Sequence, residues 1–262
     1  MNNFRDEYRN RRYLANVSAF GTIQLHERNP LIVALWSVSF PGFGHFLLHK
    51  YIRGFALFTW ELFINQLTML NTAMMHSFQG NFALAKAALN EKYVYLYIPV
   101  YLFAIWDSYT SAVEENNLYL LAKREDAPYS SFVMNALGLN YLTKKKPWLA
   151  IAWSSSVPSL GQLYTNRIAS SLFTLFFTII IAIQSNMIEG LHHFLLGHWA
   201  KSREVMNPQW VLYFPSVYFF SMYDAYVNTV ENNKLFDHEL AGFLQSKHQP
   251  QAFILHKGEK VH

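Results

Sequence analysis

Long apolar runs alternate with short polar stretches along the chain, and one apolar run is interrupted in its middle. Residues 29–54 are apolar except near their ends, and Pro41, Gly42 and Gly44 fall together inside this run. Proline removes a backbone donor and glycine relaxes the backbone, so a turn costs little at this point. The pattern predicts a broken helix. It is either a kinked helix that spans a membrane or a re-entrant hairpin that enters and leaves on one side.

The same pattern occurs again 117 residues later. The matching residues are Pro30 and Pro147, Pro41 and Pro158, Gly44 and Gly161, and Lys50 and Arg167. Residues 106–117 also recur, at 223–234, with the same offset. Because stretches far apart within each copy share one offset, we predict two tandem repeats. The expected divisions are a charged tail at 1–12, repeats at 13–117 and 130–234, a connector at 118–129 and a polar tail at 235–262.

Each repeat also contains apolar runs of membrane-spanning length. Residues 168–187 carry no charge over about 20 positions, which is enough to cross a hydrocarbon core of roughly 30 Å. Residues 94–106 and 210–223 are similar and are flanked by Tyr and Trp, as is typical of membrane interfaces. We predict two transmembrane helices in each repeat, at 54–78 and 93–113 and at 168–187 and 210–230, with polar linkers at 79–92 and 189–208.

A shorter segment precedes the broken run in both repeats. Residues 13–25 and 131–142 mix apolar and polar positions at helical spacing and lead into basic residues. This pattern predicts an interfacial amphipathic helix in each repeat. An ordinary loop is the alternative. The predicted fold class is therefore all-α, a polytopic membrane bundle with an interfacial helix, a broken segment and two transmembrane helices in each repeat.

The distribution of Lys and Arg between the two sides of the membrane distinguishes the two topologies. If the broken segment spans the membrane, the two sides carry 12 and 9 basic residues. If it is re-entrant, one side carries 17 and the other 4. Because basic residues gather on the cytoplasmic side of membrane proteins, the count favours the re-entrant reading, with both termini in the cytoplasm. Such a segment needs cover from protein, so the two repeats are expected to pack on each other.

Composition supports a membrane class and excludes several others. Hydrophobic residues make up 52% of the chain and charged residues 15%, against roughly 25% charged in soluble domains. Mean hydropathy is only +0.06, because polar ends and loops dilute the apolar runs. The chain has no cysteine, so it has no disulfides or thiol chemistry. We expect no cleavable signal peptide in its charged N-terminal residues. A net charge of +4 reflects topology and does not indicate nucleic-acid binding.

Acidic residues mark the end of the last helix in each repeat. Asp107 and Glu114 are seven residues apart, hence on one helix face, and Asp224 and Glu231 repeat this spacing. Both topologies place them on the side of Lys50 or Arg167 of the same repeat. We predict an ion pair or a cation site at this cytoplasmic boundary, because acidic residues near a membrane usually have a partner. The alternative is a solvated helix end.

A polar stripe distinguishes the first repeat from the second. The stripe comprises Glu61, Asn65, Thr68, Thr72 and His76, which share one face of a helix. Stripes of this kind in membrane helices face a bundle interior or a water-filled cavity. At the 117-residue offset, the second repeat has Thr178 in place of Glu61 and Ala182 in place of Asn65. Transport through a single polar site is one interpretation, and hydrogen bonding between helices is the other.

Residues suited to metal binding or catalysis do not form recognisable motifs. His45 and His49 are four residues apart, but Gln162 and Asn166 replace them in the second repeat, which preserves hydrogen bonding and loses metal affinity. His192, His193 and His198 lie in the second linker without a metal motif. Phosphate loops and nucleophile elbows are absent, and Ser154, Ser155 and Ser156 have no base nearby in the sequence. We predict no metal and no cofactor.

The broken segment and the end of the last helix resemble the TM2-domain family of small membrane proteins. The residues that carry the resemblance are Gly42, Gly44, His45, Phe46, Trp106 and Asp107, with a weaker match at Pro158, Gly161, Tyr164 and Asp224. The Arg and the final Leu-Gly of the family pattern are missing here. The resemblance implies an integral membrane module, mostly of unassigned function, and implies no catalytic residues.

The sequence thus predicts a multi-pass protein of the cell membrane without a catalytic site. It is expected to bind or organise lipids or partner proteins in the bilayer, where the partner is another membrane protein or a second copy of the chain. A small transporter or channel with a polar site around Glu61 is the alternative, since repeats and broken helices are common in transporters. A membrane enzyme is the third interpretation.

Overall fold

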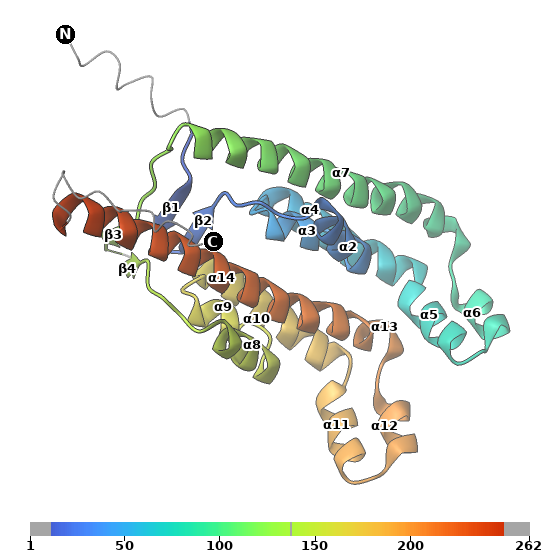
Figure 1. The fold of residues 1–262 in the computed structure, drawn as a ribbon. Coiled ribbons are helices and arrows are strands. Elements are labelled where there is room, and N and C mark those ends of the chain that lie inside the picture. Colours follow the sequence, from blue (N-terminus) through green and yellow to red (C-terminus); the bar gives the residue numbers. More distant parts are fainter. Residues whose placement is uncertain (1–11, 137, 249–262) are drawn as a thin grey trace, which may run out of the picture.

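The computed structural model describes residues 12–136 and 138–248, and this part of the chain is mostly helical. The first half contains β1 (Ala15–Ser18), β2 (Gly21–Gln24), α2 (Pro30–Ser39), α3 (Phe43–Leu47), α4 (Tyr51–Thr68), α5 (Leu70–Phe78), α6 (Phe82–Ala88) and α7 (Glu91–Arg124). The second half contains β3 (Phe132–Asn135), β4 (Gly138–Tyr141), α8 (Pro147–Ser156), α9 (Leu160–Tyr164), α10 (Ile168–Gln184), α11 (Met187–Leu195), α12 (Trp199–Val205), α13 (Pro208–Val211) and α14 (Tyr213–His248). The elements follow in the same order in both halves, with α13 and α14 in the place of α7 (Figure 1).

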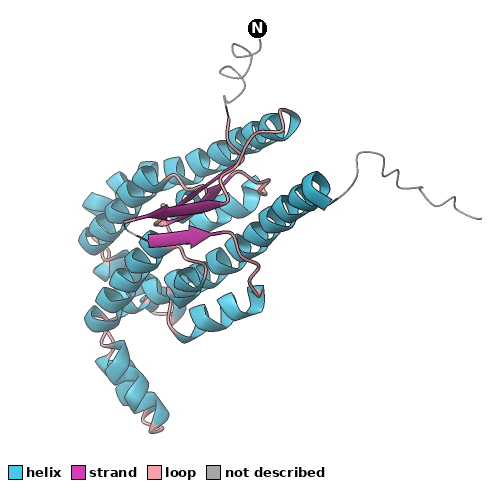
Figure 2. Ribbon diagram, turned by 90° about the vertical axis from the view of Figure 1, so that its left-hand side faces the viewer, coloured by secondary structure: helices cyan, strands magenta, loops and turns pink. Residues whose placement is uncertain are grey.

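The long helices α7 and α14 give the molecule two distinct ends. Both strand pairs lie at the end where α7 and α14 terminate, whereas the helix pairs α5–α6 and α11–α12 lie at the opposite end (Figure 1). Figure 2 shows the two strand pairs lying together between the ends of the long helices. Asn140 joins them, because its Nδ2 donates to the Ser18 carbonyl at 2.8 Å.

The predicted interfacial helices at 13–25 and 131–142 are wrong, because both segments form antiparallel β-hairpins. Ala15 pairs with Gln24 in the first hairpin and Phe132 with Tyr141 in the second. Buried and exposed positions alternate along β1, as expected for a half-buried strand. The β-branched residues in these segments favour strands, and a segment this short fits a period of two as well as a helical period.

The broken segment turns back within the molecule, so that it begins and ends beside the same part of α7. At its start, the Arg28 amide donates to Asn116 Oδ1 at 2.9 Å, and Asn116 Nδ2 donates to the Arg28 carbonyl at 2.7 Å. At its end, the His49 ring lies 3.3 Å from the Arg28 guanidinium. In the second half, the Lys145 amide likewise donates to Asn233 Oδ1 at 2.8 Å, and Asn233 Nδ2 donates to the Lys145 carbonyl at 2.7 Å.

Two glycines make this reversal possible in the first half. Gly42 follows Pro41, which lies just beyond the end of α2, and it has a φ of 102°, a region that side chains other than glycine rarely adopt. A Cβ on Gly44 would lie 2.6 Å from the Val33 carbonyl and 2.9 Å from Ser108 Cβ. Glycine at this position therefore lets α3 pack closely on both α2 and α7. Gly161 is equally close to Ala150 and Ala225 in the second half.

The predicted transmembrane helices are each shorter or longer than expected. The helix expected at 54–78 breaks at Met69, where φ is 55°, and its counterpart breaks at Asn186, where φ is 53°. The linkers at 79–92 and 189–208 contain helices, and α7 continues to Arg124. Among the described residues, no single helix is long and apolar enough to cross a membrane, whereas α10 and α11, bent by 66°, pass that test together.

Aromatic side chains fill the core between the halves. Phe43 of α3 stacks on Phe220 of α14 with ring centroids 4.1 Å apart, and Phe58 of α4 meets Phe177 of α10 at 4.5 Å. Such pairs add about 0.5–1.5 kcal/mol each beyond the apolar area that they bury. The packing of the halves on each other therefore depends largely on these rings.

Replacing Gly44 by Ala tests the close approach of α3. We expect Gly44→Ala to lower the free energy of unfolding by about 1–3 kcal/mol, because the added methyl group overpacks the contact. Denaturant unfolding followed by tryptophan fluorescence measures the change. Gly242→Ala is the control, since its Cβ meets nothing within 4 Å and α14 should gain up to about 1 kcal/mol. Equal unfolding of Gly44→Ala and the unmodified protein would contradict this account of the turn.

Candidate functional site

A buried carboxylate on the long helix of each half holds the broken segment in place. In the first half, His45 Nε2 on α3 lies 2.8 Å from Asp107 Oδ2 on α7, and the His45 side chain is fully buried. Arg53 on α4 donates to both oxygens of the same carboxylate, at 3.1 and 3.2 Å. The side chain of Arg53 is 60% exposed, so solvent weakens this ion pair.

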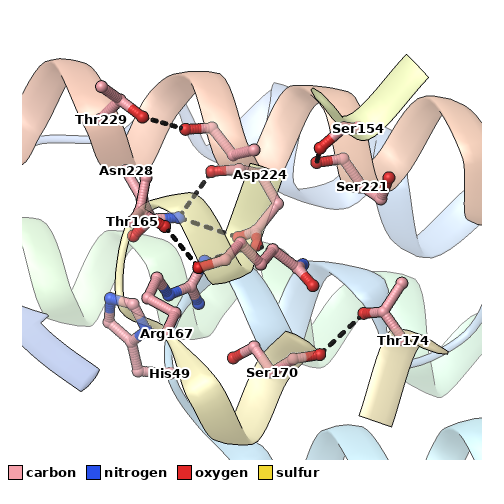
Figure 3. Close-up of polar contacts among 12 residues, drawn as sticks. His49, Ser154, Thr165, Arg167, Ser170, Thr174, Ser221, Asp224, Asn228 and Thr229 are labelled. Atoms are coloured by element: carbon pink, nitrogen blue, oxygen red, sulfur yellow. Dashed lines mark hydrogen bonds and ion pairs between the residues drawn. The ribbon is translucent and has the colours of Figure 1, made fainter. Parts of the chain in front are cut away.

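In the second half the corresponding carboxylate, Asp224, is buried together with a positively charged side chain, Arg167. Gln162 Nε2 on α9 donates to Asp224 Oδ2 at 2.7 Å, and the Arg167 guanidinium donates to the same oxygen. Asn228 Nδ2 donates to Asp224 Oδ1 at 2.9 Å (Figure 3). The side chains of Arg167 and Asp224 are only 3% and 2% exposed. Buried and multiply hydrogen-bonded charges of this kind define a rigid polar point in an otherwise apolar region.

The structure brings together only some of the predicted pairs. Of the residues grouped by the prediction, Arg167 contacts Asp224, and Lys50 lies 3.8 Å from Glu114. Lys50 precedes α4 and does not contact Asp107, whereas Arg53, within the first turn of α4, faces Asp107. The pairing of Glu231 with Arg167 is also not found, because Glu231 accepts from Lys234 at 2.7 Å. The substitution of Gln162 for His45 was the signal for this site, since both side chains donate to the carboxylate.

A cavity of about 240 Å³ lies between the halves, next to Arg167 and Asp224. Its wall is largely aromatic: Phe43, Phe46, Phe55, Phe58, Phe173, Phe177 and Phe220 line it, together with Tyr51, Ala169, Ser170, Thr174 and Val217. Gln162 also lines the cavity, and its Oε1 is buried without a hydrogen-bond partner. The cavity is therefore apolar along most of its wall and polar at one end.

A smaller space of about 70 Å³ continues from the cavity under the β1–β2 hairpin. Tyr51, Arg167, Ala169 and Ser170 line both spaces. Arg167 Nη2 donates to the Tyr51 hydroxyl at 3.5 Å, which joins α4 of one half to the start of α10 of the other. The polar end of the cavity thus faces the end of the molecule that carries the hairpins.

Sequence reasoning missed the aromatic wall and Arg53. The chain is 17% aromatic, and Phe173 and Phe177 are four residues apart on one face of α10. These were the available signals for an aromatic patch. Their convergence with Phe43, Phe58 and others from the first half depends on how the halves pack, which no local pattern reveals.

The polar stripe of the first half divides between two helices and bonds to the second half. The prediction that one helix carries the whole stripe is wrong, because Thr72 and His76 lie on α5 beyond the break at Met69. Asn65 Oδ1 accepts from Gln209 Nε2 at 2.8 Å, and Gln209 Oε1 accepts from the Thr72 hydroxyl at 3.1 Å. Further members of this network are Asn71, which donates to the Gln209 carbonyl, and Glu61, which accepts from Asn65 at 2.9 Å. Thr68 donates to the Asn65 carbonyl at 3.2 Å.

The described histidines do not assemble into a metal site. Burial, followed by the nearby charge of Arg28, lowers the pKa of His26 to about 3, so its ring is neutral at pH 7. At the opposite end of the molecule, the His193 ring is tilted against those of His192 and His198, at centroid distances of 5.7 and 6.2 Å. Within the described residues, no group of three or more His, Asp or Glu side chains is placed to hold a metal ion.

Comparisons of the chain with protein-family models, curated proteins and solved structures gave no match. The resemblance to the TM2-domain family therefore stays a prediction.

Removing Arg167 tests the buried ion pair. We expect Arg167→Ala to destabilise the protein by about 3–5 kcal/mol, because it leaves the Asp224 carboxylate buried and unpaired. Arg53→Ala, at the exposed pair, should cost less than about 1 kcal/mol. Thermal unfolding of the purified protein measures both. Adding Asp224→Asn to Arg167→Ala should restore part of the loss, and a loss that stays unchanged would contradict the electrostatic explanation.

Proposed function

We propose that the protein is an integral membrane protein of two tandem repeats that binds the apolar part of a lipid between them. The distribution of side chains supports the membrane placement. Large apolar residues are exposed along the outer faces of the helices, for example Leu102, Trp106, Leu172, Phe176 and Phe219, each at least 58% exposed. Small polar residues are buried between the helices, for example Ser37, Ser108, Ser221 and Thr229, each at most 1% exposed. Membrane helices pack through small and polar residues and present apolar ones to lipid.

The reversal of the broken segment supports a re-entrant topology. Helix α2 has ten residues and is therefore about 15 Å long, half of a hydrocarbon core of roughly 30 Å. Both ends of the segment lie beside the same part of α7, where Arg28 contacts Asn116 and Lys50 lies 3.8 Å from Glu114. With this arrangement the basic residues divide 17 to 4, and the end with the hairpins is the cytoplasmic end.

The cavity between the halves is the observation that carries the proposed binding function. An aromatic wall accommodates a hydrocarbon chain, and the buried Gln162 Oε1 beside Arg167 offers an acceptor to a head group. A lipid hydroxyl, amide or amine would supply the missing donor. The ligand class is therefore an amphiphile with one chain in the cavity and a hydrogen-bond donor near the cytoplasmic boundary.

The network around Glu61 supports hydrogen bonding between helices rather than transport. The amide oxygens of Asn65, Asn71 and Gln209 each accept a hydrogen bond from a neighbouring residue. None of the cavities described above is lined by Glu61. We therefore assign the stripe to the joining of the two repeats.

Filling the cavity tests the proposal. We expect Thr174→Phe to weaken the binding of a pyrene-labelled monoacylglycerol about tenfold, which corresponds to about 1.4 kcal/mol, because the added ring occupies the volume of the chain. Fluorescence titration of the protein in detergent micelles measures the affinity. Ile179→Phe is the control, since Ile179 lies on the exposed face of the same helix. Equal affinity of the two variants, or no saturable binding to the unmodified protein, would overturn the proposal.

A further inference from the structure

The interface between the two halves joins two different surfaces. The first half contributes α2, α3 and α4, and the second half contributes α10 and α14. Three ring pairs carry the contact: Trp36 with Tyr223 at 5.2 Å, Phe43 with Phe220 at 4.1 Å and Phe58 with Phe177 at 4.5 Å. We call the surface around Trp36, Phe43 and Phe58 the front face, and the surface around Tyr223, Phe220 and Phe177 the rear face. Because the halves share their order of elements, each also has the other face.

The two remaining faces are apolar and partly exposed. The front face of the second half comprises Trp153, Leu160 and Leu175, 117 residues after their counterparts. The rear face of the first half comprises Trp106, Phe103 and Trp60, 117 residues before theirs. Trp153, Trp106 and Phe103 are 48%, 61% and 50% exposed. Each chain therefore has a free front face on its second half and a free rear face on its first half. These two faces correspond to the pair that meets inside the chain.

The two hairpins show the same difference between a covered and an uncovered surface. The tip of the β1–β2 hairpin packs on the start of α10: a Cβ on Gly21 would lie 3.5 Å from Arg167 Cα, and the Ala169 amide is 3.5 Å from the Phe20 carbonyl. Among the described residues, the β3–β4 hairpin tip and the start of α4, which are the counterparts of these two sites, make no such contact. A Cβ on Gly138 meets nothing within 4 Å, and Ile52, which corresponds to Ala169, is 88% exposed.

We propose that copies of the chain associate head to tail in the membrane plane through these faces. The front face of the second half covers the rear face of the first half of the next copy, and the β3–β4 hairpin packs at the start of α4 of that copy. A contact between two different surfaces is heterologous, so it produces a ring if the rotation closes and an open row if it does not. All copies keep one orientation across the bilayer, because the two halves of a chain do.

Contacts between copies are weaker than the contact within a chain. Asn65 and Gln209, which bond across the internal interface, have Ala182 and Lys92 as counterparts. Apolar side chains recur at all six positions, although Leu160 and Leu175 replace two of the rings, whereas this polar contact does not recur. The association between copies is therefore reversible. Detergent breaks it more readily than it breaks the contact between the two halves of one chain.

Cysteine cross-linking tests the proposal cleanly, since the chain has no cysteine of its own. Two differently tagged chains are co-expressed, one with Trp106→Cys and the other with Trp153→Cys, and membranes are treated with a short bifunctional maleimide. We expect cross-linked pairs that carry both tags. Each single variant expressed alone should give no pairs, because a heterologous contact does not bring Trp106 to Trp106 or Trp153 to Trp153. Trp36→Cys with Tyr223→Cys in one chain is the positive control, and should cross-link internally.

The companion experiment excludes random collision. Phe219 is 59% exposed on α14, outside both faces, so Phe219→Cys co-expressed with Trp106→Cys should give fewer than about a tenth of the mixed pairs, as expected for sites that differ by about 1.4 kcal/mol in contact free energy. Equal yields from both mixtures would mean that lipid covers the faces, and would overturn the proposal. Pairs formed by Trp106→Cys alone would indicate a symmetric interface and would overturn it as well.

Discussion

The hydrogen bond from the broken segment to a carboxylate on the long helix is the contact on which each half depends. A chain that reverses direction in apolar surroundings has to satisfy its own polar groups, because an unpaired buried group costs about 1–3 kcal/mol. His45 and Asp107 meet this need in the first half, and Gln162 and Asp224 in the second. Asn116 and Asn233 fix the start of each segment to the same long helix. The short helices α2 and α8 are held in place by these contacts, and the aromatic core assembles against them.

The two halves differ in which charged side chains they bury. The second half buries the Arg167–Asp224 pair at the edge of the cavity, whereas Asp107 of the first half pairs with Arg53, whose side chain reaches the surface. The first half instead buries Glu61 and its amide neighbours, which bond to Gln209 of the second half. Each half thus supplies one polar cluster to the interface between them. The Arg167–Asp224 pair forms the polar end of the aromatic cavity between the halves.

Several features followed from the sequence because they depend on local chemistry. The break at Pro41 and Gly42 and the contact of Arg167 with Asp224 could be predicted from residue type and from the 117-residue offset. The helical fold is confirmed. The hairpins were mistaken for helices because 13 residues at mixed spacing fit both periods, and the outcome depends on the packing of Ala15 and Val17 against Leu142 and Leu235. Arg53 displaced Lys50 because one helical turn decides which side chain faces Asp107. The aromatic cavity depends on residues of both halves, so no single stretch predicts it.

The orientation of the broken segment is the central claim, and thiol labelling tests it most directly in this cysteine-free chain. Glu27→Cys, Arg53→Cys and Gln79→Cys place single thiols before the segment, after it and at the far end of the molecule. The first two should react with a membrane-impermeant maleimide only in inside-out vesicles, and Gln79→Cys only in intact cells. Labelling of Glu27→Cys and Arg53→Cys from opposite sides, or recovery of the chain outside the membrane fraction, would contradict the account.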